Sequence, residues 1–322
     1  MNESGKRSLV FGPGQDGSYL VDLLLERGDT VHVFHRHSSV DNLARIRHCL
    51  DRVTLHRGDV TDLDSVQTAV NKADPHEIYN VADQDNIAWS FAAPDYQRRV
   101  THGGARHVMM AAVKHNRDIR VFQPLSCTMF GNAPPPQDEY APVDPKSPYA
   151  REKSLVWNLV RSYRDKGLFV AAGIMFNHDS PRRAPGYLLQ SVCSQAVEVA
   201  AGRREKVTVG HPDARVDVGY ARDYMTAAIA MLKRDVPDDY CVGTGEARSV
   251  RLMVDWALNC AGFGPTKENA GRIGVDEAIA PGPQPTYRAN VDKARRVLGW
   301  EPTTDVGSLI NMLVRHFQQE NP

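Results

Sequence analysis

Ser126, Tyr149 and Lys153 are of the types, and have the spacing, needed to move a proton and fix a substrate oxygen. A lysine four residues after a tyrosine lies on the same face of a helix. Its charge favours the phenolate, so a tyrosine with an ordinary pKa of about 10 can exchange a proton near neutral pH. The serine hydroxyl would hold the substrate oxygen. The three residues therefore predict hydride transfer with acid/base catalysis, although Tyr149 and Lys153 could also be an ordinary exposed pair.

The start of the chain predicts the element that would hold a dinucleotide near these residues. The apolar run Ser8–Phe11 ends in Gly12-Pro13-Gly14-Gln15-Asp16-Gly17, and a helical pattern up to Gly28 leads to a second strand at Thr30–Phe34. Glycines at this spacing, between a strand and a helix, allow the backbone to approach a pyrophosphate at the helix N-terminus. We therefore expect Gly12, Gly14, Gln15, Asp16 and Gly17 to contact the cofactor.

The end of the second strand favours one nicotinamide cofactor over the other. An acidic residue there would bind the ribose hydroxyls of NAD, but the sequence reads His35-Arg36-His37-Ser38-Ser39. Arg36, Ser38 and Ser39 suit a 2′-phosphate, so NADP is favoured and NAD remains the alternative. Arg36 could also be a solvated surface residue.

Further strands should bring more residues to the same edge of the sheet, where ligands bind in open parallel sheets. Val53–Val60 is expected to place Asp59 near the adenine, and Glu77–Ala82 to end beside the cofactor. Arg120–Leu125 leads directly to Ser126. The remaining expected elements are helices over 105–115 and from Tyr149 to about Lys166, a buried strand over 168–176, and a return to the sheet at 240–243.

Composition excludes several classes of protein. Lys plus Arg and Asp plus Glu are equal at 39 each, so no net field would attract nucleic acid or an anionic membrane. The five cysteines and the scattered histidines show no metal-ligand spacing. No apolar run is long enough to span a bilayer. These features predict a soluble cytoplasmic protein with a small-molecule partner and no metal site.

The residues resemble the extended short-chain dehydrogenase/reductases that modify nucleotide sugars, and most closely the GDP-mannose 4,6-dehydratase family. The matching segments extend over nearly the whole chain: 14–20, Arg36 with Ser38-Ser39, 77–80, Ser147-Pro148-Tyr149, 176–183, Asp223-Tyr224, 244–251 and 298–302. The resemblance implies an α/β fold, a Rossmann-type doubly wound parallel sheet with a smaller, interleaved C-terminal substrate domain. Residues 1–180, with a return near 215–245, would form the dinucleotide-binding domain, and 181–322 mainly the substrate domain.

The resemblance also implies roles for individual residues. Ser126, Tyr149 and Lys153 fall on the catalytic hydroxyl, tyrosine and lysine. The positions implied to contact NADP are Arg36, Ser38, Ser39, Asp59, Val60, Gln84, Tyr96, Lys153, His178 and Arg183, and Ala82 ends the fourth strand beside them. Candidate substrate contacts are Ser90, Asn177, Arg215 and Arg288. A homodimer or homotetramer would be typical of the family.

One departure from the family concerns the reaction itself. The dehydratases carry a glutamate two residues after the hydroxyl residue, which removes the proton at carbon 5 once carbon 4 is a ketone, whereas this chain has Thr128. A hydroxyl group is no competent base. The string Ser126-x-Thr128 instead resembles that of nucleotide-sugar 4-epimerases, and a 4-keto reductase needs the same three groups. Asp83, Asp85 or Cys127 could supply another base.

Other departures concern the substrate. Phe11 occupies the position of the family's first glycine, although Gly12 restores the spacing. Leu189-Gln190-Ser191 replaces a basic stretch that helps hold the guanine nucleotide, and a further charged segment is replaced around Ala280–Pro283. A GDP-sugar is therefore a doubtful substrate.

These observations predict an NAD(P)-dependent enzyme that transfers hydride at a nucleotide sugar. Carbon 4 is the expected site, with a 4-epimerase or 4-keto reductase favoured and Thr128 included in the catalytic group. The alternatives are a 4,6-dehydratase that uses a different base and a non-catalytic cofactor-binding relative.

Overall fold

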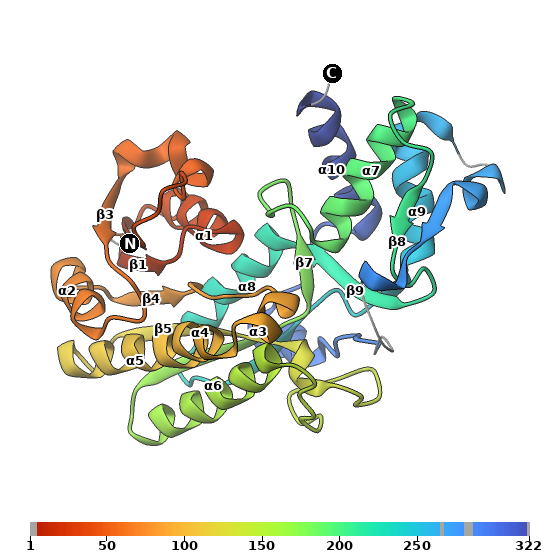
Figure 1. Cartoon of the computed structure of the whole chain (residues 1–322). Helices are drawn as coiled ribbons and strands as arrows, with labels where there is room; N and C mark the ends of the chain where they lie inside the picture. The colour runs from red at the N-terminus through yellow and green to blue at the C-terminus, as the bar shows by residue number, and fades with distance from the viewer. Residues whose placement is uncertain (1–4, 265–266, 280–285, 321–322) are drawn as a thin grey trace.

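A seven-stranded parallel sheet forms the centre of the molecule (Figure 1). The computed structural model describes residues 5–264, 267–279 and 286–320, so the segment Ala280–Pro283 lies outside the described residues. The strand order is β10-β6-β5-β4-β1-β2-β3. The strands are β1 (Arg7–Phe11), β2 (Thr30–His35), β3 (Val53–Arg57), β4 (Glu77–Asn80), β5 (Arg120–Ser126), β6 (Phe169–Met175) and β10 (Asp239–Val242).

The order of the strands reverses between β1 and β4. From β1 the chain moves outward through β2 to β3, and from β4 it moves the other way through β5 to β6. In a doubly wound sheet the crevice for a ligand lies at this reversal, beyond the carboxyl ends of the strands. The glycine turn follows the carboxyl end of β1 and the segment 81–86 follows that of β4, so both segments start at this reversal.

Two of the expected strands are shorter than predicted. The third strand ends at Arg57 and not at Val60, and the fourth ends at Asn80 and not at Ala82. The third strand stops because Gly58 and Asp59 form a turn: the Asp59 carboxylate accepts from the backbone N–H of Thr61 at 2.8 Å, and Asp59 C=O accepts from Asp62 N–H. Asp side chains stabilise turns in this way.

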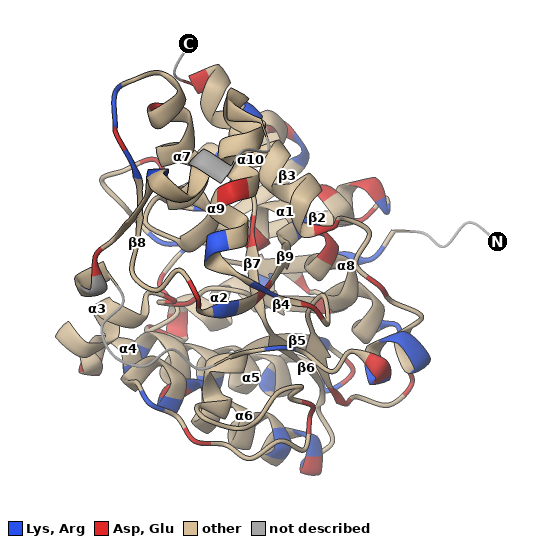
Figure 2. Cartoon of the chain, turned by 90° about the vertical axis from the view of Figure 1, so that its right-hand side faces the viewer, with Lys and Arg blue, Asp and Glu red and all other residues tan. Residues whose placement is uncertain are grey.

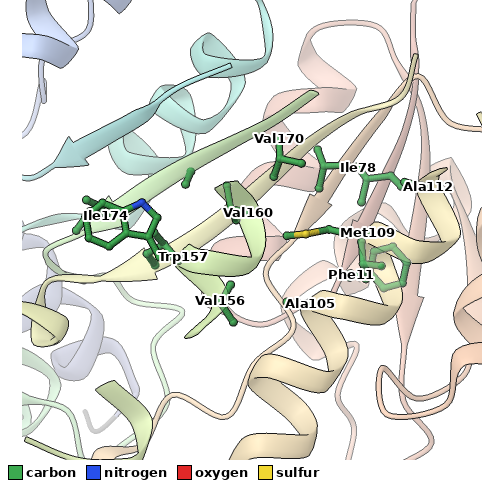
Figure 3. Packing of buried hydrophobic residues seen from close by; sticks show 14 of the residues in the cluster. Phe11, Ile78, Ala105, Met109, Ala112, Val156, Trp157, Val160, Val170 and Ile174 are labelled. Atoms are coloured by element: carbon green, nitrogen blue, oxygen red, sulfur yellow. The ribbon is translucent and has the colours of Figure 1, made fainter. Parts of the chain in front are cut away.

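Helices cover both faces of the sheet. One face packs against α2 (Leu63–Ala73), α5 (Gly104–His115) and α6 (Pro148–Asp165), and the other against α1 (Gln15–Glu26) and α8 (Ala221–Leu232). Figure 3 shows part of the first layer, where Met109 and Val160 lie between their helices and the sheet residues Phe11 and Val170. This is a Rossmann-type α/β fold. Short helices α3 (Ile87–Ala92) and α4 (Pro94–Arg98) and the π-helix η2 (Arg99–Gly103) lead into α5, and the 3₁₀-helix η1 (Ala44–Arg52) precedes β3.

A second group of elements has its own apolar core beside the large sheet (Figure 1). Helices α7 (Leu188–Ala200), α9 (Val250–Leu258) and α10 (Val306–Glu320) pack together there. Strand β9 (Arg215–Tyr220) pairs with β7 (Asn177–Asp179) and β11 (Ala247–Ser249), and β8 (Val207–Val209) with β12 (Ile273–Val275). The remaining short helices are η3 (Cys127–Phe130), η4 (Asn259–Phe263), η5 (Lys267–Arg272), η6 (Glu277–Ile279) and η7 (Ala294–Leu298).

The segment 215–245, where we expected a return to the large sheet, is divided between the two groups. Strand β9 belongs to the three-stranded sheet, whereas α8 packs on the large sheet and β10 pairs with β6. Basic and acidic residues are interspersed over the view in Figure 2. Among the residues that the structure describes, no helix is long and apolar enough to cross a membrane.

A buried carboxylate, Asp217, joins three separate segments at the three-stranded sheet β11-β9-β7, called the small sheet below. Asp217 lies on β9 and is fully buried. It accepts hydrogen bonds from the backbone N–H groups of Thr244 at 2.9 Å, Gly245 at 3.0 Å and Ala289 at 3.0 Å, and from the Thr244 hydroxyl at 2.6 Å. Because the carboxylate and the Ala289 N–H are buried, loss of Asp217 would leave buried donors unsatisfied, and Asp217 should therefore contribute strongly to stability.

We expect Asp217→Ala to lower the free energy of unfolding by about 3 kcal/mol or more, since each buried donor left unsatisfied costs about 1–3 kcal/mol. Urea denaturation followed by circular dichroism measures the change. Asp213→Ala is the matched control, because its exposed carboxylate pairs with Arg251 at the surface and its removal should cost at most about 0.5 kcal/mol. Equal losses for the two variants would contradict the prediction.

Candidate active site

Ser126 stands at the carboxyl end of β5, at the edge where the sheet was expected to bind its ligand. Its side chain caps η3: the hydroxyl accepts from Thr128 N–H at 3.3 Å, which turns the chain sharply at the end of the strand. The hydroxyl oxygens of Ser126 and Thr128 are 2.9 Å apart. Thr128 is therefore in direct contact with the predicted substrate-orienting hydroxyl.

Tyr149 and Lys153 lie near the start of α6. Ser147 caps this helix by accepting from Ala150 N–H at 3.1 Å, and Pro148 occupies its first turn. The side chains of Tyr149 and Lys153 are both buried, so the interpretation as an ordinary exposed pair is wrong. Lys153 Nζ lies 5.7 Å from the centre of the Tyr149 ring and donates to Pro124 C=O at 2.9 Å. The lysine thereby ties α6 to β5 just before Ser126.

The charges around Tyr149 differ from the sequence-based expectation. Burial, followed by the negative charges of Asp83 and Asp85, raises the pKa of Tyr149 well above its ordinary value. A hydrogen bond with Ser126 and the charge of Arg183 act to lower that pKa, but their effect is smaller than that of burial and the two carboxylates. Lys153 does not face the tyrosine as an unpaired cation, because its Nζ is 2.6 Å from Asp83 Oδ2.

The glycine turn has the shape that close approach of a phosphate requires. Gly12 has φ +88°, and a Cβ there would lie 2.8 Å from Ala82 Cα. A Cβ on Gly17 would lie 1.9 Å from the carbonyl oxygen of Gly12. Gly14 is the N-cap of α1, has no side-chain capping bond, and has open space where its Cβ would be. Unsatisfied N–H groups beside this space fit a pyrophosphate at the helix N-terminus.

An ion pair links the glycine turn to the small sheet. His178 on β7 lies with its Nε2 3.0 Å from Asp16 Oδ2 on α1, and its Nδ1 lies 2.8 Å from Phe176 C=O. Burial alone would raise the pKa of Asp16, but His178 and Arg183 lower it to about 2. Next to this pair, the Ser180 hydroxyl donates to Gln15 Oε1 at 2.8 Å. The structure thus brings together predicted cofactor residues from opposite ends of the Rossmann region.

Arg183 forms a second link across the crevice. Its guanidinium lies 2.8 Å from Asp85 Oδ2 and stacks on the Tyr187 ring at 3.5 Å from the ring centre. The Tyr187 hydroxyl donates to Asp85 Oδ1 at 2.8 Å. The sequence reasoning missed Tyr187, which has no distinctive spacing and is identified only by its place opposite Arg183.

At the predicted adenine end of the site, some of the expected cofactor residues contact one another and others do not. Arg36 donates to the Tyr96 hydroxyl at 3.2 Å, which joins two predicted cofactor residues from separate elements. Arg57, which the sequence reasoning missed, contacts His37 and adds a second cation near the end of β2. The other predicted contacts make local bonds: Ser38 accepts from Val40 N–H, Val60 C=O lies 2.8 Å from His107 Nδ1, and Gln84 donates to Asn86 C=O and Gln97. Ser39 is exposed beside them.

The four candidate substrate residues do not form one cluster in the described structure. The Ser90 hydroxyl is buried and donates to Ile87 C=O at 2.6 Å, within its own helix. Asn177 is exposed at the start of β7, and Arg215 donates to Ala247 C=O. Arg288 is exposed, and its backbone pairs with Gln137. These four residues therefore lie on separate segments and have separate hydrogen-bond partners.

A separate group of possible metal ligands lies outside the crevice. Atoms of Asp22, His48 and Cys49 lie within 4.8 Å of one another. Asp22 is already paired with His48 at 2.7 Å and with Arg182 at 2.7 Å. The carboxylate charge is therefore offset by protein groups.

The fold is that of the short-chain dehydrogenase/reductase class. The GDP-mannose 4,6 dehydratase family model matches residues 9–313. The chain belongs to this family. GDP-mannose 4,6 dehydratase 1 of Arabidopsis thaliana is 35% identical over 324 residues, covering 96% of this chain and 89% of that protein. The GDP-mannose 4,6-dehydratase of Sinorhizobium fredii (strain HH103) is 35% identical over 340 residues, covering 96% of each.

Solved structures share the fold at lower sequence identity. A UDP-glucose-4-epimerase from Stenotrophomonas maltophila with bound NAD has a TM-score of 0.84 and 20% identity, covering 98% of each chain. RMD from Pseudomonas aeruginosa, complexed with NADPH, has a TM-score of 0.80 and 17% identity, covering 97% of this chain and 99% of that one. The dTDP-glucose 4,6-dehydratase of Bacillus anthracis also has this fold, with a TM-score of 0.82 and 19% identity, covering 98% of this chain and 97% of that one. Epimerases and dehydratases therefore share this architecture, and the fold does not select among their reactions.

Proposed function

We propose that this protein is an NAD(P)-dependent enzyme that transfers hydride at carbon 4 of a nucleotide sugar, as a 4-epimerase or a 4-keto reductase. The observation that carries the proposal is the contact between the hydroxyls of Ser126 and Thr128 at 2.9 Å. A hydroxyl stands where a dehydratase of this family would present a carboxylate. The site therefore has groups for proton and hydride exchange at carbon 4, but no glutamate beside Ser126 to remove a proton from carbon 5.

In this proposal each of the three residues has one task. Tyr149 exchanges a proton with the substrate oxygen, Ser126 orients that oxygen by a hydrogen bond, and Lys153 holds the nicotinamide ribose. The nicotinamide, when bound, supplies or accepts the hydride. Cys127 is unsuited to act as a base, because burial raises the pKa of its thiol.

The proposed cofactor is NADP, with NAD as the alternative. Gly14 and the N-terminus of α1 would hold the pyrophosphate, and Arg36, with Ser38 and Ser39, the 2′-phosphate. Support comes from the uncapped N-terminus of α1, and from Arg36 and Arg57 beside the end of β2. NAD and NADPH are both bound by structural neighbours.

We expect Arg36→Ala to weaken NADP⁺ binding by about 10–100-fold and to leave NAD⁺ binding within about threefold, because a charge-assisted hydrogen bond contributes about 1.5–3 kcal/mol. Isothermal titration calorimetry with both cofactors measures the two affinities. Arg98→Ala removes an exposed arginine that pairs with Asp95 and serves as the control. An equal loss of affinity for both cofactors would show that Arg36 does not bind the 2′-phosphate.

The reaction is tested by incubating the purified protein with GDP-, UDP- and dTDP-sugars, with and without added NADPH. An epimerase gives an isomer of unchanged mass without net consumption of cofactor, and a reductase converts a 4-keto sugar to a product heavier by two hydrogens. A product lighter by one water would overturn the proposal.

Dehydration is the second candidate, because the curated relatives are named dehydratases and Asp85 offers a carboxylate near Tyr149. The Asp85 side chain is 44% exposed, although Arg183 and Tyr187 hold it. If water is lost, Asp85→Asn should abolish that loss and retain reduction of the cofactor by the substrate alcohol. Asp95→Asn, on exposed α4, is the matched control.

A further inference from the structure

A buried ion pair holds the lysine of the proposed active site. Lys153 Nζ lies 2.6 Å from Asp83 Oδ2, and the two side chains are 4% and 12% exposed. The pair is therefore largely shielded from water. Opposite charges in such a buried position attract each other far more strongly than at the surface. Lys153 Nζ also donates to Pro124 C=O at 2.9 Å, which fixes its position between β5 and the segment after β4.

The carboxylate of Asp83 is itself held in place. Its Oδ1 accepts from the backbone N–H of Gln84 at 2.8 Å and from the Thr101 hydroxyl on η2. Thr101 in turn accepts from Gln97 Nε2 at 2.6 Å. Oδ1 of Asp83 thus accepts hydrogen bonds from the protein, and Oδ2 pairs with Lys153. The residue is positioned to act on the lysine and is a poor candidate for a free base.

The groups that face Tyr149 come from four segments. Asp83 and Asp85 lie on the segment after β4, Lys153 on the same helix as Tyr149, Ser126 at the end of β5, and Arg183 after β7. After burial, Asp83 is the first cause that raises the pKa of Tyr149, and the hydrogen bond with Ser126 and the charge of Arg183 act in the opposite direction. Asp83 therefore opposes the effect that a lysine at this position would otherwise have.

We infer that Asp83 is a positioning residue that pairs with Lys153 beside Tyr149, offsets the charge of this lysine, and so adapts the site to reduction of a ketone. The inference rests on the proposed function and narrows it to the reductive step. In that step the C4=O double bond becomes a single bond as hydride from the reduced nicotinamide forms the C4–H bond. The substrate oxygen takes the proton of Tyr149 Oη, and the phenolate regains a proton from water.

The test is the pH dependence of both directions of reaction. Ketone reduction needs the phenol and should decline as pH rises through the pKa of Tyr149, whereas alcohol oxidation needs the phenolate and should rise over the same range. In Asp83→Asn both transitions should move to lower pH by about one unit or more, because Lys153, whose Nζ lies 5.7 Å from the centre of the Tyr149 ring, would then act without its paired carboxylate, and an opposite charge at about 4–6 Å shifts a pKa by about 1–3 units. A purely structural role for Asp83 would change both rates without moving either transition, and this result would overturn the inference.

Two further variants complete the experiment. Asp95→Asn removes an exposed carboxylate of α4 and should leave both transitions in place. Thr101→Val removes a hydroxyl that donates to Asp83 but keeps the charge of the carboxylate, so the transitions should stay in place or move to higher pH. If Asp83→Asn does not fold, Thr101→Val decides: a shift of both transitions to lower pH would overturn the inference.

A readout without substrate separates this inference from the proposed function. The ultraviolet phenolate signal of the protein minus that of Tyr149→Phe reports the titration of Tyr149 alone. The midpoint of this difference should lie at lower pH in the Asp83→Asn background. That shift would support the inference even if no nucleotide sugar reacts, whereas coincident midpoints would contradict it even if a ketone is reduced.

Discussion

Tyr149→Phe should lower kcat by about 10²–10⁴-fold, the usual contribution of a positioned acid or base. The substitution removes only the hydroxyl, and the ring can keep its buried position. Cofactor affinity and the unfolding midpoint should therefore change little. Steady-state kinetics with the substrate identified by the product assay measures the loss.

The matched control is Tyr163→Phe, which removes a hydroxyl from the same helix at a position remote from Ser126. It should retain activity within about twofold, as surface and helix substitutions outside a site usually do. Full activity in Tyr149→Phe would contradict the proposed mechanism. It would then favour a non-catalytic cofactor-binding role, particularly if the wild type also turned over none of the nucleotide sugars.

Gly17→Ala should nearly abolish cofactor binding and destabilise the fold by about 1–3 kcal/mol, the range for overpacked sites. The added Cβ would lie 1.9 Å from the carbonyl oxygen of Gly12, and a backbone atom cannot move aside as a side chain can. The turn must open, which displaces the N-terminus of α1 from the phosphate site. A displacement of about 1 Å can cost about 10²-fold in function. Calorimetric titration with NADP⁺ and thermal unfolding measure the two effects.

Gly14→Ala distinguishes the phosphate site from simple packing. A Cβ at Gly14 would meet no atom within 4 Å, so the variant should fold as the wild type does. It should nevertheless bind NADP⁺ more weakly, since the methyl group would occupy the space that we assign to the pyrophosphate. Unchanged affinity in Gly14→Ala would place the pyrophosphate elsewhere.

The sequence predicted the parts of the fold that depend on local pattern. The glycine turn, the strands before and after it and the helix that carries Tyr149 all follow from apolar periodicity and from residues with special backbone requirements. Strand ends were less predictable. Asp59 ends the third strand early because its side chain bonds to the backbone of Thr61, and such a local turn competes with strand pairing.

The electrostatics of the site could not be predicted in the same way. Asp83 and Asp85 were recognised as carboxylates near the site, but their partners lie far away in sequence. Lys153 is on α6 and Arg183 follows β7, so only the folded chain shows that each carboxylate is matched with a cation. The roles assigned to Ser126, Tyr149, Lys153 and the cofactor contacts remain proposals that the variants above test.

The contact between Gly12 and Ala82 means that the phosphate turn and the proton-transfer site cannot vary independently. Any side chain on Gly12 would press against the backbone of Ala82, and the next residue is Asp83, which holds Lys153. When substitutions in the turn and in the segment after β4 are combined, the change in the free energy of unfolding should differ from the sum of the separate changes, as expected for residues in contact. Changing the shape of the phosphate turn would accordingly require the segment that holds Lys153 to change with it.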